Sequence, residues 1–363
     1  MMQRARPIDL TLLGAALALA LVGLVAIYSA TYDDGPGTFR KQAVWVVLSF
    51  CLALVVRRVD YRLLVGLSRS LYVLNLLALL LVKFFGTPSN GAVRWISLGS
   101  FKFQPSEFSK LITIISLTAF VQSHASFVRR LGGLCLSLAY VLPSVVLILK
   151  QPDLGTSLVL LVVWCGIVYV AGAQPKHLAA MGIAGVLAFA GLWHTDKLKE
   201  YQKQRIFSFL NPSADPQHTG WHTLQSKIAI GSGGLTGKGL FRGTQGQHGF
   251  IPEQHTDFIN TVIGEELGFV GSVVVLALFF TLIYRALRIA VESNDPHGRL
   301  IAVGIAAMFT FQVFVNLGMT IHLMPITGLP LPFVSYGGSS MMVNMLAVGV
   351  LLNIHRYREE LRF

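Results

Sequence analysis

The sequence contains 363 residues, of which 53% are hydrophobic and only 13% are charged. Water-soluble folds of this length rarely have so few charges, so the composition excludes an ordinary soluble enzyme and indicates an integral membrane protein. The formal net charge of +12 could favour nucleic acid, but the basic residues gather at the ends of apolar runs, where they set topology and contact anionic membrane lipid. No nucleic-acid-binding motif is present, so we expect no nucleic-acid partner.

The first apolar run, Leu10 to Ala30, is longer than the core of a secretory signal and lacks a clean cleavage site, so we interpret it as a retained membrane span. Similar runs recur along the chain. They predict an all-α, polytopic membrane protein with ten transmembrane helices in a single domain, residues 1–363. The predicted spans are 9–28, 43–57, 69–85, 107–122, 133–149, 155–172, 178–194, 260–284, 300–322 and 338–355.

An even number of spans puts both termini on one side of the membrane. The short connections on that side carry more lysine and arginine than those on the other, which predicts that both termini are cytoplasmic. The large loop 195–257, between the seventh and eighth spans, is then extracytoplasmic. The Gly- and Pro-rich segments 86–107, 150–157 and 322–340 emerge on the same outer side. We therefore expect the functional site to lie outside, where there is no ATP.

Asp257 lies where the long loop meets the eighth predicted span, two residues after His255. An aspartate in this position could simply cap the helix and interact with its dipole. Alternatively, a partly desolvated carboxylate has the raised basicity expected of a general base. On a continuous helix Glu265 would lie about 12 Å deeper in the membrane. We interpret Glu265 and its neighbour Glu266 as structural groups that bond helix to helix.

In QPSEFSK, Pro105 suits the first position of a helix, and Glu107 and Lys110 follow at i,i+3 spacing. The pair could be an ordinary exposed salt bridge of little energetic value, or it could fix a polar site at the rim of a cavity. The spacing leaves both readings open. The segment PITGLPLPFVSYGGSS, 325–340, contains three prolines and no charge, and so predicts broken backbone that forms the wall of a cavity.

The Gly-rich segment 231–247 resembles a phosphate-binding loop, but Ser232 stands where a nucleotide-binding loop requires its first glycine. We therefore exclude a nucleotide site. Lys238 and Arg242 in this segment, with Lys227 before it, suit a diphosphate through charge-assisted hydrogen bonds, although solvated surface charge is an equal alternative.

The motifs GAVRWISLG, QPSEFSK, QPDLGTS, GWHTLQSKIAIGSGG, GTQ, PEQHTDFI, GEELG and PITGLPLPFVSYGGSS follow one another over nearly the whole chain. This series resembles the SEDS family, the shape, elongation, division and sporulation proteins. RIFSFLNPSADP and GTQ are more similar to the rod-shape elongation type than to the division type. The resemblance implies a ten-helix peptidoglycan glycosyltransferase of the bacterial cytoplasmic membrane, acting in cell elongation and rod-shape maintenance. It also implies that the enzyme polymerises lipid II on the outer face, with a class B penicillin-binding protein as its transpeptidase partner.

The resemblance also implies particular site residues. The essential aspartate of the family falls on Asp257. Other family residues that line or support the cavity fall on Trp95, Glu107, Lys110 and Asp153. His255, beside the aspartate, is a further supporting candidate. The chain departs from the family at Asn260, where an aromatic residue is usual, and at His322, where a small residue is usual. Both departures concern the shape of the pocket.

The implied substrates, lipid II and a polyprenyl-diphosphate-linked glycan, require a groove open to lipid, cations for the diphosphate and a base for a sugar hydroxyl. Formation of a β-1,4 bond from an α-linked donor inverts the anomeric carbon, and a single displacement with one base is the simplest route. We predict that Asp257 is this base. The negative charge of the diphosphate leaving group could be neutralised by a divalent cation, Mg²⁺ or Mn²⁺, or by lysine and arginine side chains. The candidates are Lys110, Lys227, Lys238 and Arg242.

A divalent ion at Asp257 is a rival role for the same carboxylate, and the sequence leaves the choice between base and metal ligand open. No organic cofactor is expected. A lipid II flippase or other lipid transporter is the alternative function. It would predict polar residues in both halves of the membrane, whereas here they crowd the outer side. A structural scaffold for a cell-wall synthase would not need an acid at position 257.

Overall fold

The computed structural model describes residues 8–32, 35–89, 92–99, 101–193, 219–244 and 254–357, together with the isolated positions 195, 203, 207 and 209. In this part of the chain the regular structure is mainly helical. The helices are α1 (Leu10–Ala30), α2 (Gly37–Val56), α3 (Tyr61–Gly66), α4 (Ser68–Phe85), α5 (Pro105–Ser123), α6 (Ala125–Val128), α7 (Leu131–Lys150), α8 (Leu154–Val170), α9 (Pro175–Trp193), α11 (Thr219–Ser232), α13 (Ile259–Glu266), α14 (Gly268–Glu292), α15 (Pro296–Thr320) and α16 (Gly338–Arg356). A small antiparallel sheet, in the order β1 (Thr87–Ser89), β2 (Ala92–Leu98) and β3 (Phe101–Phe103), lies between α4 and α5.

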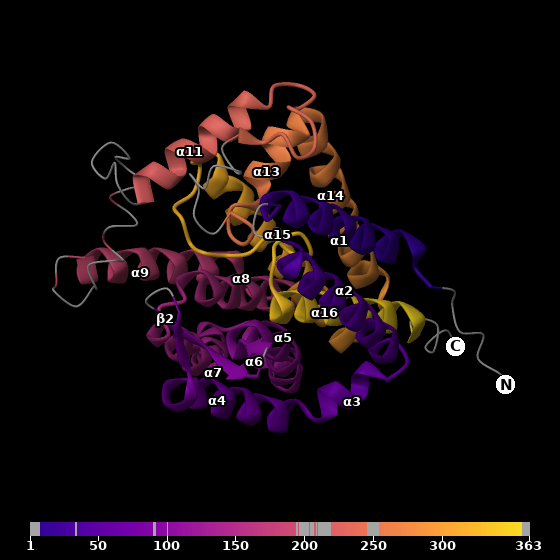
Figure 1. The fold of residues 1–363 in the computed structure, drawn as a ribbon. Coiled ribbons are helices and arrows are strands. Elements are labelled where there is room, and N and C mark those ends of the chain that lie inside the picture. Colours follow the sequence, from indigo (N-terminus) through magenta and orange to yellow (C-terminus); the bar gives the residue numbers. More distant parts are fainter. Residues whose placement is uncertain are drawn as a thin grey trace.

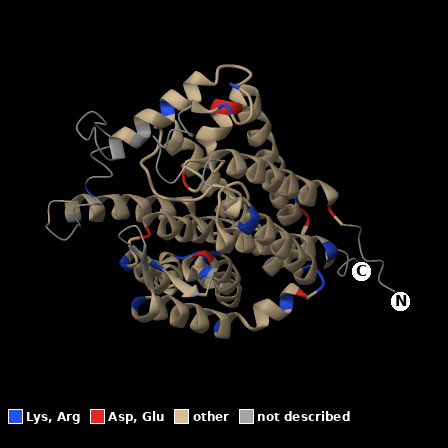
Figure 2. Ribbon diagram, in the orientation of Figure 1, with Lys and Arg blue, Asp and Glu red and all other residues tan. Residues whose placement is uncertain are grey.

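Each of the ten predicted spans overlaps a helix of the structure. Seven helices, α1, α2, α4, α7, α14, α15 and α16, are long and apolar enough to cross a membrane, and α8 is apolar but shorter, with 17 residues. The chain is therefore a multi-pass membrane protein, and the count of ten crossings stays a prediction. In Figure 1, α1 begins and α16 ends at the same side of the bundle, as an even number of crossings requires. Figure 2 shows long stretches of helix without charged residues.

The prediction of one helix over 260–284 is wrong, because the structure breaks this segment between α13 and α14. The break falls at Gly268, whose φ of +64° is a left-handed conformation that glycine adopts at little cost. The Gly-rich segment fits into the break. Its Gly234 and Leu235 carbonyls accept hydrogen bonds from the first backbone N–H groups of α14, while its Lys238 and Gly239 N–H groups donate to the last carbonyls of α13. The apolar span thus begins at Gly268.

This break changes the depth of the acidic residues. Asp257, Glu265 and Glu266 all precede the span instead of entering it, and α13 packs against α11, as Figure 1 shows. The long predicted loop 195–257 therefore contains at least one helix, α11, which is tied to the end of α15 by a 2.6 Å hydrogen bond from Ser226 Oγ to the Thr320 carbonyl. The parts of that loop at 196–202, 210–218 and 245–253 lie outside the described residues.

The first and last regions of the chain meet along α2 and α16, which run parallel. At one end Gln42 donates to the Ser335 carbonyl and accepts from the Gly337 N–H. At the other end the Asn353 amide donates to three carbonyls that follow or end α2, at distances of 2.6 to 3.3 Å. Between these ends Gly349 allows α16 to approach the Ala53 backbone closely. This contact fixes the proline-rich segment, residues 325–340 at the start of α16, relative to α2.

Candidate functional site

Asp257 lies on a turn before α13 and is partly exposed. It is not the N-cap of that helix, since the capping position is Phe258 and no side chain makes a capping hydrogen bond there. The structure therefore does not support the reading in which Asp257 simply caps the eighth predicted span. The carboxylate is instead part of an irregular segment at one end of the helix bundle.

The backbone on both sides of Asp257 is held by residues from much later in the chain. The Asn316 amide donates to the carbonyls of Asp257, at 2.9 Å, and of Leu329, at 2.7 Å. The Ser335 hydroxyl donates to the Thr256 carbonyl at 2.6 Å, and the Tyr336 N–H donates to the His255 carbonyl at 2.9 Å. Three consecutive carbonyls, 255 to 257, are thus fixed to α15 and the proline-rich segment. The turn that carries the carboxylate is therefore rigid.

The proline-rich segment also joins Asp257 to the start of α8. Gly328, with a φ of +74°, lies so close that an added β-carbon would be 3.4 Å from Asp257 Oδ2. The next residue, Leu329, packs on Gly155, where an added β-carbon would meet it at 2.6 Å. The predicted wall is thus broken backbone that passes between the carboxylate and α8.

Asp153 caps α8 and links it to α5. Its Oδ1 accepts from the Thr156 N–H at 3.1 Å, and its Oδ2 accepts from the Ser106 hydroxyl at 3.2 Å. Beside Ser106, Glu107 Oε2 and Lys110 Nζ are 2.8 Å apart, with side-chain exposures of only 3% and 0%. The pair is therefore not an exposed surface salt bridge. A buried pair is a poor source of stability but fixes geometry, because either charge alone would be costly.

Trp95 lies on β2 and is partly buried. Its neighbour Arg94 anchors the sheet to the turn between α7 and α8, because its guanidinium donates to the Gln151 carbonyl, at 3.0 Å, and to the Pro152 carbonyl. Arg94 was not predicted from the sequence, although a basic residue beside a motif tryptophan was an available signal. Asn316 was also missed, and its signal was an amide side chain within the apolar span 300–322.

The structure does not gather the four candidate cations around Asp257. Lys110 is paired with Glu107, and Lys238 Nζ is 2.6 Å from Glu265 Oε1. Arg242 is exposed in the segment that follows Lys238. Lys227 is exposed on α11, next to the bond between Ser226 and the end of α15. Among these candidates, Lys227 is therefore the exposed cation that is tied most directly to the elements holding Asp257.

Glu265 and Glu266 connect α13 to other elements. Glu266 Oε1 accepts from the Ser29 hydroxyl near the end of α1, at 2.5 Å. Glu265 Oε1 accepts from Lys238 and from the N–H and hydroxyl of Thr244, at 2.6 to 3.0 Å. Glu266 thus bonds helix to helix as we inferred, whereas Glu265 bonds α13 to the Gly-rich segment, and both lie before the membrane span.

The two departures from the family pattern lie at the same end of α15. The Asn260 amide donates to the Thr320 hydroxyl at 3.0 Å. His322 follows two residues later with a φ of +63°. Burial, and then the nearby charge of Lys227, lower the pKa of the His322 imidazole. The His255 ring packs edge-on against Tyr336, with centroids 5.5 Å apart. Asn260 and His255 thus contact the elements that hold the turn of Asp257.

Within the described ranges, no group of three or more histidine, cysteine or acidic side chains could hold a metal ion. A cage built from these protein residues alone therefore does not fit. Mg²⁺ or Mn²⁺ at a phosphate substrate needs only one or two carboxylates and takes its other ligands from phosphate and water. The partly exposed carboxylate of Asp257 fits the requirement for one protein carboxylate at such a phosphate-bound ion.

The fold and the site define a multi-pass helical membrane protein that holds a partly exposed carboxylate at one end of its bundle. The family model described as "Cell cycle protein", which covers FtsW, RodA and SpoVE, matches residues 9–360. The chain belongs to this family.

Two curated relatives are similar over nearly their full length. The probable peptidoglycan glycosyltransferase FtsW of Trichlorobacter lovleyi is 39% identical over 356 residues, covering 95% of this chain and 92% of that protein. The peptidoglycan glycosyltransferase MrdB of Escherichia coli K12 is 36% identical over 354 residues, covering 98% and 95%. A solved structure concerned with the coordination of polymerization and crosslinking by a peptidoglycan synthase complex contains a chain with 34% identity. Its TM-score is 0.86, with coverage of 97% of this chain and 99% of that one.

Proposed function

We propose that this chain is a peptidoglycan glycosyltransferase that polymerises lipid II into glycan strands on the outer face of the bacterial cytoplasmic membrane. The names of its relatives support this activity, because the identity extends over nearly the whole of each chain. The single structural observation that carries the proposal is the position of Asp257. Its carboxylate is partly exposed, and its backbone is fixed by α15 and the proline-rich segment.

In the proposed reaction Asp257 accepts the proton of the acceptor 4-hydroxyl as that oxygen attacks the anomeric carbon of the donor. The bond from this carbon to the diphosphate oxygen breaks, and the electron pair leaves with the diphosphate. A single displacement inverts the α-linked donor to a β-1,4 product and needs one base. The hydrogen bond from Asn316 to the Asp257 carbonyl restricts where the carboxylate can reach. Such restriction favours productive contact with one hydroxyl.

The negative charge that develops on the diphosphate needs a cation. We assign this function first to Lys227, because Ser226 beside it bonds to Thr320, which also bonds to Asn260, three residues after Asp257. Lys110 and Lys238 already have carboxylate partners, which leaves less of their charge for a ligand. A divalent cation held by Asp257 would supply the same neutralisation.

The remaining motif residues have supporting functions in this proposal. Asp153 ties the start of α8 to Ser106 of α5, and the buried pair of Glu107 and Lys110 fixes the first turns of α5. Trp95 lies on the sheet that Arg94 anchors to the α7–α8 turn. These contacts would hold the walls of a substrate cavity at fixed separation while a saccharide passes.

We further propose a class B penicillin-binding protein as the partner, since the similar solved structure concerns a complex that coordinates polymerization with crosslinking. The relatives named FtsW and MrdB match at comparable identity. Our proposal of a role in elongation and rod shape therefore rests on the RIFSFLNPSADP and GTQ segments. Most of these residues lie outside the described part of the chain.

The test is polymerisation of lipid II by the purified protein with its partner and a divalent cation. Asp257→Ala and Asp257→Asn should abolish glycan strands while leaving folding and partner binding unchanged. Asp60→Asn is the control, because Asp60 caps α3 and asparagine caps equally well. Strand synthesis by Asp257→Ala at the wild-type rate would eliminate the proposed base. Movement of lipid II across vesicles by a wild-type protein that never polymerises it would favour the transporter.

A further inference from the structure

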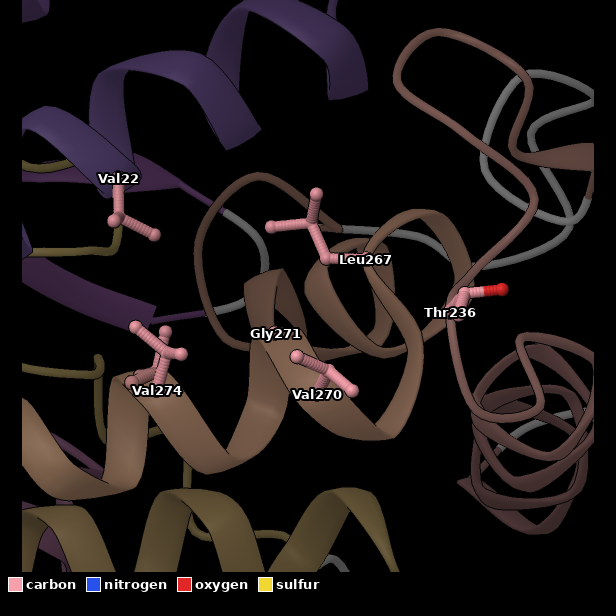
Figure 3. A pocket seen from close by; sticks show the side chains of 7 residues that line it. Val22, Thr236, Leu267, Val270, Gly271 and Val274 are labelled. Carbon is pink, nitrogen blue, oxygen red and sulfur yellow. The ribbon is translucent and has the colours of Figure 1, made fainter.

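Two adjoining apolar hollows, of about 340 and 270 Å³, lie between α1 and the junction of α13 with α14. They share Val22 and Leu267 and form one groove. Figure 3 shows Val22 of α1 across the gap from Gly271 and Val274 of α14. The other lining side chains come from α1, α13, α14 and the Gly-rich segment, and among them only Thr236 and Glu266 are polar. Nearly all of these side chains are hydrocarbon.

Both long walls of the groove are helices that can span a membrane. At its rim, Leu21 is 61% exposed and Val274 is 51% exposed, so the groove opens outward to the hydrocarbon that surrounds the bundle. A single hydrocarbon chain is narrow enough to enter.

Aromatic rings mark one end of this groove. Phe241, next to the lining residue Leu240, contacts the rings of Tyr28 and Tyr32 with centroids 5.5 and 5.7 Å apart, and Tyr28 also contacts Phe39 at 5.2 Å. Tyrosine and other aromatic side chains gather where lipid headgroups meet the hydrocarbon. The groove therefore ends at the level of the headgroups.

A cation is positioned at that end. Arg242 follows Phe241 and is exposed, and it forms no ion pair with a residue of the described ranges. Its turn is fixed, because Lys238 and Gly239 donate backbone hydrogen bonds of 3.0 Å to the end of α13, and the Arg242 N–H donates to the Gly239 carbonyl at 3.2 Å. The charge of Lys238 is already met by Glu265. Arg242 is thus an exposed cation available to an anion at the mouth of the groove.

We propose that this groove binds one acyl chain of an anionic glycerophospholipid, and that Arg242 binds its phosphate. The site is separate from the proposed reaction. Helix α13, eight residues and about 12 Å long, begins two residues after Asp257 and ends at the groove residue Glu266. The groove therefore adjoins the end of α13 that is remote from the proposed base, which favours a membrane phospholipid over the polyprenyl substrate.

The experiment places the purified full chain in nanodiscs containing equal amounts of phosphatidylglycerol and phosphatidylcholine, and native mass spectrometry then identifies the lipids retained after mild delipidation. The wild type should retain phosphatidylglycerol about fivefold better than phosphatidylcholine, as expected for one cation at a membrane surface. Arg242→Gln should remove this preference. Val274→Trp, which fills the groove from an exposed position, should remove the retained lipid altogether.

Two matched controls address general effects of charge and bulk. Lys83→Gln removes an exposed cation near the end of α4, and Leu276→Trp places a tryptophan at an exposed position of α14 that does not line the groove. Both should behave as the wild type. Equal retention of the two lipids by the wild type would overturn the proposal, as would equal loss in the controls. Retention of an added polyprenyl phosphate in place of phosphatidylglycerol would also overturn it, by assigning the groove to substrate.

Discussion

The Asp257 carboxylate lies against the backbone of Gly328, where an added β-carbon would be 3.4 Å from Oδ2. The bulkier substitution Gly328→Val should displace the carboxylate. It should reduce polymerisation by about 100-fold, the effect expected of a 1 Å misplacement. Gly35→Val is the matched control, because Gly35 also has a positive φ, +83°, but no atom lies within 4 Å of its β-position. Polymerisation assays on both variants separate backbone strain from contact with Asp257, and equal losses would contradict the contact.

Asn316 and Gln312 lie one turn apart on α15 and should respond oppositely to replacement by leucine. Asn316→Leu leaves the Asp257 and Leu329 carbonyls without their donor, and each unpaired buried group costs about 1–3 kcal/mol. The buried Gln312 amide has no hydrogen-bond partner in the described structure, so Gln312→Leu should be neutral or stabilising. Thermal unfolding in one detergent measures both. A large destabilisation by Gln312→Leu would reveal a bound water or another partner at that amide.

The buried pair of Glu107 and Lys110 predicts strong non-additivity. Lys110→Met should destabilise the fold by about 3–5 kcal/mol, because it leaves the Glu107 carboxylate buried without a counter-charge. The double variant Glu107→Leu/Lys110→Met should recover most of that stability. Denaturant unfolding of the single and double variants gives the coupling energy. A double variant no more stable than Lys110→Met would show that the pair is not the source of the loss.

Two glycines of α1 differ in what surrounds them. A β-carbon on Gly23 would lie 2.6 Å from the Val334 carbonyl oxygen, whereas a β-carbon on Gly14 would meet no atom within 4 Å. Gly23→Ala should push the proline-rich segment away from α1 and reduce both stability and activity. Gly14→Ala should stabilise by about 1 kcal/mol, since alanine favours a helix interior over glycine. Unfolding temperatures of both variants test the contrast, and a stabilising Gly23→Ala would contradict the close packing.

A further prediction concerns acid sensitivity at the other end of the bundle. Burial alone would raise the pKa of Asp295, but hydrogen bonds from His297, Tyr61 and Gly298 outweigh it and lower the pKa below its usual range. The unfolded chain then binds a proton at higher pH than the folded chain does. The stabilisation is therefore complete above the ordinary aspartate value of about 3.9 and is lost as the pH falls below it.

Removal of the Tyr61 hydroxyl, which donates to Asp295 Oδ2 at 2.6 Å, should raise that pKa. Tyr61→Phe should lower the unfolding temperature at neutral pH and weaken its dependence on pH between about 5 and 3. Tyr72→Phe is the control, because the Tyr72 hydroxyl donates to the Tyr140 backbone carbonyl, which does not titrate. An unchanged pH profile for Tyr61→Phe would rule out this linkage.

The sequence predicted the helices well where long apolar runs determine them, as in α15 and α16. It could not predict the break before Gly268, because the apolar pattern continues across it. The break depends on hydrogen bonds from Phe269 and Val270 to carbonyls of the Gly-rich segment more than thirty residues earlier. Periodicity within one segment carries no information about such a distant partner.

Prediction of the site from the sequence has the same limit. The motifs indicated Asp257, and the proline content of 325–340 correctly predicted irregular backbone beside it. The contacts that hold the carboxylate in place could not be inferred, because Asn316 and Ser335 reach it only through the packing of α15 and the proline-rich segment. The burial of the Glu107 and Lys110 pair also could not be predicted from the sequence, since i,i+3 spacing is identical for exposed and buried pairs.

The supports of Asp257 have a consequence for biosynthesis. Asn316 lies 59 positions after the aspartate, and Ser335 lies 79 positions after the threonine that precedes it. A nascent chain that has emerged from the ribosome only as far as α14 therefore contains Asp257 but neither Asn316 nor Ser335. The turn can take its final shape only when α15 has inserted and the segment before α16 has folded back. Assembly of this region is thus among the last events of maturation, so a chain truncated before α15 cannot form it.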